Sequence, residues 1–268
     1  MIGQHNLQSR IEQLIENGTF PRFSIFVGPK GSGKKTLLLE MFEGIYLEDN
    51  KVESVRKMID MAYKIGNRTF IMPDADTMSN AAKNALLKVI EECPNDNYFI
   101  MTLEDENNTL ETIRSRGTVF HMDRYTPDEI GSYFYDKYHA NHDKDEEEIV
   151  RELCDTPGDV DTLVKMGIKE FYDYVQLVVD NIAEVSLANA FKIPSKVALK
   201  EDAEGYDLRL FWKAFVNVCW NRSYDYDTKK YCDGIVVTSK YLQKLRAKGI
   251  NRSMLMDNWV LEIRELWR

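Results

Sequence analysis

The residues from Gly28 to Thr36 have the types and the spacing of a loop that binds phosphate. The stretch reads Gly28, Pro29, Lys30, Gly31, Ser32, Gly33, Lys34, Lys35, Thr36. Glycines let successive backbone N–H groups turn toward one anion, and Lys34 is long enough to reach the outer phosphates of a nucleotide. We therefore predict a nucleotide-binding loop for ATP or ADP. The alternative is a glycine-rich turn that carries surface lysines.

Lys35 occupies the position where such a loop usually has serine or threonine. That hydroxyl coordinates Mg²⁺, whereas a lysine ammonium cannot ligate a metal. Thr36 comes one residue later, and one residue rotates a helical side chain by about 100°. We expect Mg²⁺ to bind weakly or not at all, and metal-assisted hydrolysis to be impaired.

The segment FIMPDAD (residues 70–76) predicts a second departure from an ATPase site. In ATPases with this loop an apolar strand is followed by Asp-Glu, but here Pro73 stands at the aspartate position and Asp74 at the glutamate position. The side chain of Asp74 is shorter than glutamate, so a general base there would sit farther from the attacking water. Asp74 is thus a candidate degenerate catalytic residue. The alternative is that Asp74 and Asp76 cap a helix.

Alternating strand and helix patterns place both segments in one α/β domain. Apolar runs predict strands at 23–27, 45–49, 68–73, 97–103 and 118–122. Apolar residues at helical spacing predict helices at 4–17, 36–44, 52–66, 79–92 and 107–116. This alternation predicts a parallel five-stranded sheet with flanking helices, whose strand ends bind ligands.

The remainder of the chain is predicted to be helical. Thr126 and Pro127 favour a helix start, and DTPGD (155–159) favours a turn. After about residue 168 strand signals fade and helical periodicity dominates. We predict three domains: an α/β domain at 1–123, a small helical domain at 124–168 and a helical domain at 169–268.

The composition narrows the possible classes of protein. No apolar run reaches the ~18 residues of a membrane span, and the N-terminal stretch is amphipathic with mixed charge, unlike a secretory signal. We expect a cytoplasmic protein without a membrane partner. The net charge of −9 argues against a protein that binds DNA alone, because such binding depends on basic residues.

The 4 cysteines are scattered and form no C-x-x-C pair. This spacing predicts neither a zinc site nor a disulfide framework. We therefore expect no zinc and no other metal centre built from cysteine.

Several stretches of the sequence resemble AAA+ clamp-loader subunits, most closely the bacterial DNA polymerase III delta-prime subunit and its phage or prophage relatives. The stretches are GQHNLQSRIEQLIENGTFPRFSIFVGPKGSGKKT (3–36), PDADTMSNAAKNALLKVIEECPNDNYFIMT (73–102), TIRSRG (112–117) and NRSMLMDNWVLEIR (251–264). The resemblance spans nearly the whole chain, is most specific at 74–116 and is weakest at 125–250. It implies a P-loop AAA+ domain, a helical lid and an all-helical collar.

The resemblance also assigns roles to single residues. Arg116 corresponds to an arginine finger that reaches the ATP of a neighbouring subunit; the alternative is a surface arginine in a salt bridge. Gly117 replaces the cysteine of the family motif. A second phosphate-sensing arginine, expected after the Pro-Gly turn of the lid, is not apparent. Asp159 and Asp161 stand there instead, facing where a phosphate-binding cation is wanted. The zinc module of delta-prime is absent, because the segment from Lys34 to Asp74 has no cysteine.

The function implied is that of a clamp-loader subunit in DNA replication, which holds ATP weakly or not at all and supplies Arg116 in trans. Expected partners are gamma/tau-like and delta-like subunits, and through the assembly a sliding clamp and primer-template DNA. Whether the chain is itself an enzyme stays open. The alternatives are a self-sufficient AAA+ ATPase such as a helicase loader, a purely architectural subunit and a small-molecule kinase; the last leaves the Ser-Arg-Gly motif without a role.

Two features of the C-terminal part favour contacts with protein over contacts with DNA. The stretch 240–268 is locally basic and is interpreted as a partner surface; its basic residues are Lys240, Lys244, Arg246, Lys248, Arg252, Arg264 and Arg268. Aromatic residues at helical spacing are expected in a core or subunit interface; these are Phe211, Trp212, Phe215 and Trp220.

Overall fold

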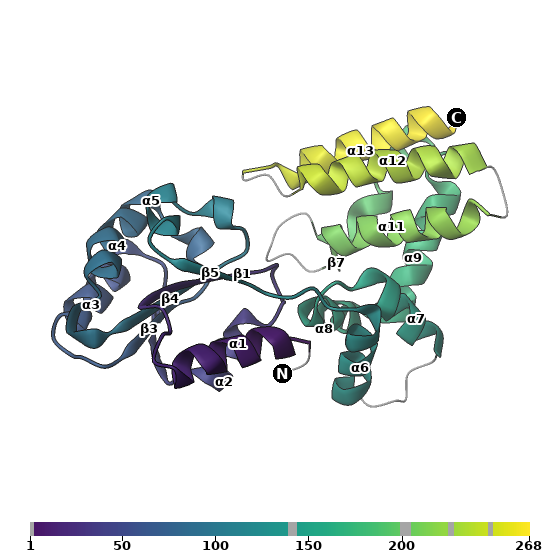
Figure 1. Ribbon diagram of the computed structural model, residues 1–268. Helices are drawn as coiled ribbons and strands as arrows, with labels where there is room; N and C mark the ends of the chain where they lie inside the picture. Colours follow the sequence, from purple (N-terminus) through teal and green to yellow (C-terminus); the bar gives the residue numbers. More distant parts are fainter. Residues whose placement is uncertain (1–2, 139–143, 199–204, 225–227, 246–248) are drawn as a thin grey trace. The chain divides into compact units, whose positions relative to one another are not determined.

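The computed structural model describes residues 3–138, 144–198, 205–224, 228–245 and 249–268 (Figure 1). The chain forms two compact units. Unit 1 comprises Met1–Glu129 with Thr156–Gly158, and unit 2 comprises Ile130–Asp155 with Asp159–Arg268. The division into three domains stays a prediction.

Unit 1 contains the predicted five-stranded sheet, in which every pair of neighbouring strands is parallel and the order is β2-β3-β4-β1-β5. The strands are β1 (Phe23–Val27), β2 (Gly44–Tyr46), β3 (Thr69–Met72), β4 (Tyr98–Leu103) and β5 (Thr118–His121). The predicted fold class is confirmed. The strand β1, which lies between β4 and β5, has the predicted bounds, because all its residues are buried and form one apolar run.

Helices cover both faces of this sheet (Figure 1). The α-helices are α1 (His5–Glu16), α2 (Lys34–Met41), α3 (Val52–Ala62), α4 (Asn80–Glu92) and α5 (Glu111–Arg114). Two apolar clusters fill the spaces between sheet and helices. Ile25 belongs to the cluster with α3 and α4, and its neighbour Phe26 to the cluster with α1 and α2, because successive strand side chains point to opposite faces.

The helix predicted at 107–116 is interrupted. A short 3-10 turn, η3 (Glu106–Asn108), comes first, Thr109 is extended, and α5 follows. The carboxylate of Asp105 accepts hydrogen bonds from the backbone and side-chain N–H groups of Asn107. Such a local side-chain bond competes with helix formation, which explains the interruption. The other 3-10 turns of unit 1 are η1 (Ala75–Thr77) and η2 (Pro94–Asp96).

Unit 2 is predominantly helical, as predicted. Its helices are α6 (Pro127–Tyr138), α7 (Lys144–Leu153), α8 (Pro157–Met166), α9 (Ile168–Asn181), α10 (Leu187–Ala190), η4 (Ile193–Lys196), α11 (Leu208–Arg222), α12 (Thr228–Lys244) and α13 (Arg252–Trp267). Two short parallel strands, β6 (Val197–Ala198) and β7 (Tyr206–Asp207), were not predicted, because two residues carry no periodic signal. In the described residues no helix is long and apolar enough to cross a membrane.

Thr126 caps the start of α6 as predicted. Its hydroxyl oxygen accepts a hydrogen bond from the N–H of Glu129, and the Glu129 carboxylate accepts one from the N–H of Thr126. This reciprocal pair satisfies two N–H groups that lack partners at a helix start.

The predicted aromatic residues of α11 lie mostly in the core of unit 2. Phe211, Trp212 and Phe215 are fully buried, whereas Trp220 is 55% exposed. All three buried rings contact Trp259 of α13, with ring centroids 4.9–6.1 Å apart. The buried rings hold α11 against α13, and only Trp220 is left at the surface.

The basic stretch 240–268 is partly used inside unit 2. Arg264 is 2% exposed and donates hydrogen bonds to the carbonyl oxygens of Ile182 and Val185. The prediction that Arg264 belongs to a partner surface is therefore wrong, because its guanidinium donates hydrogen bonds to carbonyl oxygens just after the end of α9, where a helix leaves such groups without partners. Arg246 and Lys248 lie outside the described residues.

Replacing Phe215 by alanine should lower the free energy of unfolding by about 3–5 kcal/mol, because the deletion leaves a cavity against Trp259. Urea unfolding followed by circular dichroism measures the change. The control is Trp220→Ala on the same helix, which should change it by less than about 1 kcal/mol because that ring is largely exposed. Equal losses would contradict the assignment of Phe215 to the core.

Candidate functional site

The glycine-rich loop joins the end of β1 to the start of α2, at the carboxyl edge of the sheet. Gly31 and Gly33 have φ angles of +80° and +82°, in the left-handed region that favours glycine. Such a backbone turns successive N–H groups toward one point, which is the geometry of an anion-binding nest. The glycines at these two positions are therefore required by the shape of the loop.

Lys34 is buried at the base of the loop, with only 6% of its surface exposed. Its ammonium nitrogen Nζ lies 2.6 Å from the carbonyl oxygen of Gly28 and 3.0 Å from that of Pro29, and donates to both. Burial lowers the pKa of Lys34, and the nearby carboxylates of Glu104, Asp74 and Asp76 oppose this shift. An ammonium has three donors, so one remains for a phosphate oxygen.

Asp74 and Asp76 follow β3 at the same edge of the sheet. The backbone of Asp74 is left-handed, with φ 49°, and its N–H donates to the hydroxyl oxygen of Thr102 over 2.8 Å. The carboxylate of Asp76 accepts a hydrogen bond from the N–H of Glu104 over 2.7 Å. Within the described residues neither carboxylate caps η1. The two acids thus line the ends of β3 and β4 instead of capping a helix.

Three residues of this edge were missed by sequence reasoning. Thr102 and Glu104 lie at the end of β4, and Asn50 donates from its side chain to the carbonyl oxygen of Asp74 over 2.9 Å. The strand β4 lies between β1 and β3 in the sheet, so its end must lie beside the loop. That order is not visible in the sequence, but a polar Thr-x-Glu at a strand end is a signal that could have been noted.

The residues present fit a phosphate better than a metal ion. Lys35 and Thr36 are exposed in the first turn of α2, and Pro73 supplies no oxygen from its side chain. Across the described parts of the chain, no three side chains of His, Cys, Asp or Glu are grouped to hold a metal. The loop therefore offers backbone N–H groups and Lys34 to an anion, while the two positions that usually hold Mg²⁺ carry no ligand.

Arg116 lies far from this loop. It lies two residues before β5, which runs parallel to β1 with Thr118 opposite Ser24, so Arg116 is at the amino edge of the sheet. The loop follows the last residue of β1 at the opposite edge. With about 3.3 Å per strand residue, the two edges are roughly 16 Å apart. The structure thus separates Arg116 from the other predicted site residues of the same chain.

The helix α4 holds Arg116 in place. The Nε of Arg116 donates to the Glu91 carboxylate over 3.3 Å, and its Nη1 donates to the carbonyl oxygen of Thr112 over 2.8 Å. Lys83, also on α4, donates to the carbonyl oxygen of Asn108 just before α5. The side chain of Arg116 is 35% exposed, and within the described residues its Nη2 has no hydrogen bond. That nitrogen remains available to a group from outside the chain.

Thr156 and Gly158, at the start of α8, contact the loop directly; we call the segment Thr156–Gly158 the Pro-Gly turn. The N–H of Gly158 donates to the carbonyl oxygen of Gly31 over 3.1 Å, and the hydroxyl of Thr156 lies 3.4 Å from the carbonyl oxygen of Lys30. A Cβ atom on Gly158 would lie 2.5 Å from the Cα of Gly31. The two backbones therefore touch, and only glycine permits this approach.

The acids after this turn are neutralised within unit 2. Asp159 has a side chain that is 6% exposed and accepts a hydrogen bond from Arg209 of α11. Asp161 accepts hydrogen bonds from the ammonium of Lys137 and from the hydroxyl groups of Tyr133 and Tyr138. Cations of the same unit thus pair with both acids; that the acids face a phosphate site stays a prediction.

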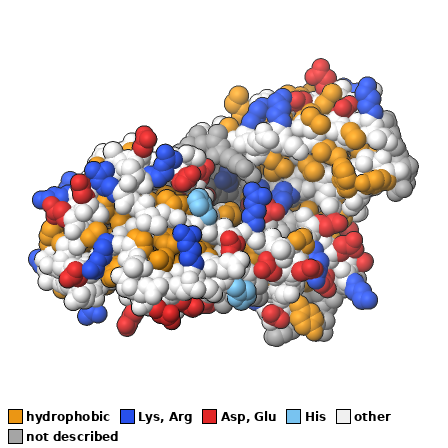
Figure 2. Space-filling view, viewed as in Figure 1, with side chains coloured by type: hydrophobic (Ala, Val, Ile, Leu, Met, Phe, Trp, Pro, Cys, Tyr) orange, Lys and Arg blue, Asp and Glu red, His pale blue; other side chains and the backbone are white. Residues whose placement is uncertain are grey.

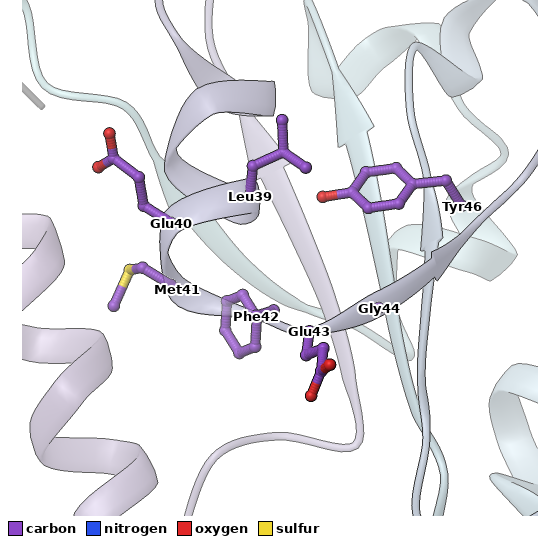
Figure 3. Close-up of a pocket in the computed structure, with 7 residues that line it drawn as sticks. All are labelled: Leu39, Glu40, Met41, Phe42, Glu43, Gly44 and Tyr46. Carbon is purple, nitrogen blue, oxygen red and sulfur yellow. The ribbon is translucent and has the colours of Figure 1, made fainter.

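A shallow hollow of about 450 Å³ lies at the opposite end of α2 from the loop (Figure 3). It is lined by Leu39, Glu40, Met41, Phe42, Glu43, Gly44 and Tyr46. Its only charged groups are the carboxylates of Glu40 and Glu43, so it is not suited to a nucleotide. Figure 2 shows acidic and basic side chains interspersed on the visible face of each unit, without a continuous basic stripe.

Comparisons with known proteins show which protein families this chain resembles. A family model described as DNA polymerase III, delta subunit, matches residues 48–126. Replication factor C subunit 3 of Saccharomyces cerevisiae is 27% identical over 137 residues, which are 44% of this chain and 40% of the relative. The delta-prime subunit of DNA polymerase III from Yersinia pestis is 39% identical over 69 residues, 24% of this chain and 20% of the relative. The resemblance to AAA+ clamp-loader subunits is confirmed.

The extent of the clamp-loader resemblance differs along the chain. The chain spans less than half the length of these two curated relatives. The family model covers Asp74 and Arg116 but not the phosphate loop. The RuvB Holliday junction branch migration motor of Thermotoga maritima matches with a TM-score of 0.50 and 14% identity over 72% of this chain and 81% of that chain. This likeness concerns the fold alone.

Asp161 and its hydrogen-bond donors Lys137, Tyr133 and Tyr138 form an ion cluster, which should make the free energy of unfolding of unit 2 depend on pH in the acid range. Burial alone would raise the pKa of Asp161, but hydrogen bonds from Lys137, Tyr138 and Tyr133 outweigh it and lower the pKa. A carboxyl group whose pKa is lower in the folded than in the unfolded chain stabilises the fold at pH values above its unfolded pKa of about 3.9. This stabilisation is lost as the pH falls through the pKa of the folded chain.

Asp161→Asn should therefore lower the free energy of unfolding at pH 7 by about 1 kcal/mol, a modest value because the cluster is partly exposed. The difference from wild type should shrink below about pH 4. Denaturant unfolding at several pH values measures it, with the exposed Asp136→Asn on α6 as control. A difference that stays constant down to pH 2 would count against the ion cluster.

Proposed function

We propose that the chain is a clamp-loader subunit of a DNA replication machine, which supplies Arg116 to the ATP site of a neighbouring subunit. The observation that carries this proposal is the position of Arg116 at the sheet edge opposite its own loop. A guanidinium there cannot reach a nucleotide on the same chain. Its free Nη2 and planar, permanently charged group suit a phosphate presented by another subunit.

The chain's own loop holds nucleotide weakly, without turnover, in this proposal. The backbone N–H groups of the loop and the ammonium of Lys34 form an anion site, so ATP or ADP can bind through the phosphates. Lys35 and Pro73 stand where the oxygen ligands of Mg²⁺ are needed, so the metal contributes little. Hydrolysis then takes place in trans, at the neighbour's site.

The partners in this proposal are gamma/tau-like and delta-like subunits. The sliding clamp and primer-template DNA are reached through the assembly, which acts in the cytoplasm. The names of the curated relatives and the net charge of −9 support this arrangement, because an acidic chain is better suited to a protein assembly than to independent DNA binding.

Arg116→Ala should lower ATP turnover by the assembled loader by roughly 10³-fold or more, because an arginine finger stabilises the charge of the transition state. Steady-state phosphate release by the loader, reconstituted with the clamp-loader subunits of the same organism, measures this loss. Arg114→Ala is the matched control, since Arg114 lies in the same segment, and among the described residues its side chain makes one hydrogen bond, of 3.5 Å to Asn107.

Size-exclusion chromatography should show that both arginine variants still assemble, because neither side chain is part of an apolar core. Unchanged turnover with Arg116→Ala in an intact assembly would contradict the proposed role. Loss of assembly in that variant alone would assign Arg116 to the subunit interface instead.

Nucleotide binding by the isolated chain should depend little on Mg²⁺. We expect the affinity for a fluorescent ATP analogue to change by less than about threefold between Mg²⁺ and EDTA, because both ligand positions lack oxygen. No phosphate release should accompany binding. The double variant Lys35→Thr with Pro73→Asp restores both ligands and should bind more tightly with Mg²⁺, whereas Lys35→Thr alone should respond less. Turnover by the wild-type chain would favour a self-sufficient ATPase.

A further inference from the structure

In the glycine-rich loop, every carbonyl oxygen from Gly28 to Gly33 accepts a hydrogen bond. The oxygens of Gly28 and Pro29 accept from Lys34, that of Lys30 from Thr156 and that of Gly31 from Gly158. The oxygen of Ser32 accepts from the hydroxyl of Tyr125 over 2.8 Å, and that of Gly33 from the N–H of Leu37 over 2.9 Å. Residues distant in the sequence thus hold the three consecutive carbonyl oxygens of Lys30, Gly31 and Ser32.

Fixing a carbonyl also fixes the N–H of the same peptide. All peptide bonds in the described chain are trans, so the N–H points away from the carbonyl. The N–H groups of Lys30, Gly31 and Gly33 belong to peptides whose oxygens are anchored by Lys34, Thr156 and Tyr125. Within the described residues these N–H groups have no acceptor, so they remain available to an anion.

A second observation points to a ligand at this place. Ser32 is 1% exposed, and its hydroxyl oxygen has no hydrogen-bond partner in the described part of the chain. This hydroxyl lies inside the loop, since a Cβ atom on Gly28 would be 2.9 Å from it. A buried hydroxyl without a partner is costly, and a phosphate oxygen would satisfy it.

We propose that Tyr125 and the turn Thr156–Gly158 are positioning residues for the loop. They hold its peptides so that their N–H groups are ready for a diphosphate, which binds without metal. Tyr125 is the stronger anchor, because its 2.8 Å hydrogen bond is shorter than the 3.4 Å contact of Thr156. The proposal rests on the anion-binding role of the loop in the proposed function, and it does not involve Arg116.

The electrostatics of the site favour a diphosphate over a metal-bound triphosphate. Lys34 keeps one donor for the anion, whereas Asp74, Asp76 and Glu104 place negative charge beside it. A triphosphate carries more negative charge than a diphosphate, so these carboxylates repel it more strongly when no metal ion screens the charge. The loop should therefore bind inorganic diphosphate or ADP with an affinity at least equal to that for ATP.

The test titrates the ¹⁵N-labelled full-length chain with inorganic diphosphate in buffer with EDTA. We expect saturable shifts of the Gly31 and Gly33 amide signals in wild type. Tyr125→Phe removes one hydroxyl and keeps the ring, and should weaken binding about fivefold, as expected for one lost hydrogen bond. Tyr135→Phe is the matched control, because Tyr135 is exposed on α6, and it should bind like wild type.

A second variant tests the turn. In Gly158→Ala the new Cβ would lie 2.5 Å from the Cα of Gly31, so the turn must move away and the shifts should no longer saturate. Circular dichroism checks that each variant is folded. Absence of binding by wild type, or equal affinity in Tyr125→Phe, would overturn the proposal.

The same titration separates this proposal from the proposed function. Arg116→Ala should bind diphosphate like wild type, because Arg116 lies at the other edge of the sheet. Failure of Arg116 to act in trans leaves the diphosphate result unaffected. Conversely, if the loop does not bind diphosphate, the expected loss of ATP turnover in Arg116→Ala is unaffected.

Discussion

The pairing of β1 with β4 on one side and β5 on the other is the constraint on which the rest of unit 1 depends. Because all strands are parallel, everything that follows a strand gathers at one edge of the sheet and everything that precedes a strand gathers at the other. The loop after β1 and the acids after β3 therefore share an edge. Arg116, which precedes β5, is placed at the opposite edge by the same rule.

The shape of the loop from Gly28 to Gly33 does not depend on a metal ligand. The shape depends on backbone geometry at Gly31 and Gly33 and on hydrogen bonds to carbonyl oxygens. None of these contacts needs a metal ion. A lysine at position 35 is therefore compatible with this architecture, since the Lys35 side chain is exposed in the first turn of α2.

Sequence patterns predicted the elements that are long or wholly buried. The strand 23–27 was predicted with its exact bounds, because an apolar run buried on both faces has no competing explanation. The helix at 107–116 was overestimated, because the Asp105 side chain stops it locally. The partners of Asp159 and Asp161 could not be predicted, since Arg209 and Lys137 are distant in sequence and only the fold brings them together.

The sequence by itself determined the residue types at single positions: glycines in the loop after the first strand, a lysine and a proline at the two positions where the prediction looks for metal ligands, and an alternation of strands and helices. These features are local, so residue type and spacing suffice to show them. Only the tertiary structure decided that Arg116 lies at the edge opposite the loop and that Tyr125 and Gly158 anchor the loop peptides. Strand order places Arg116, and hydrogen bonds between distant segments place Tyr125 and Gly158. Neither strand order nor such hydrogen bonds produce a periodic pattern in the sequence.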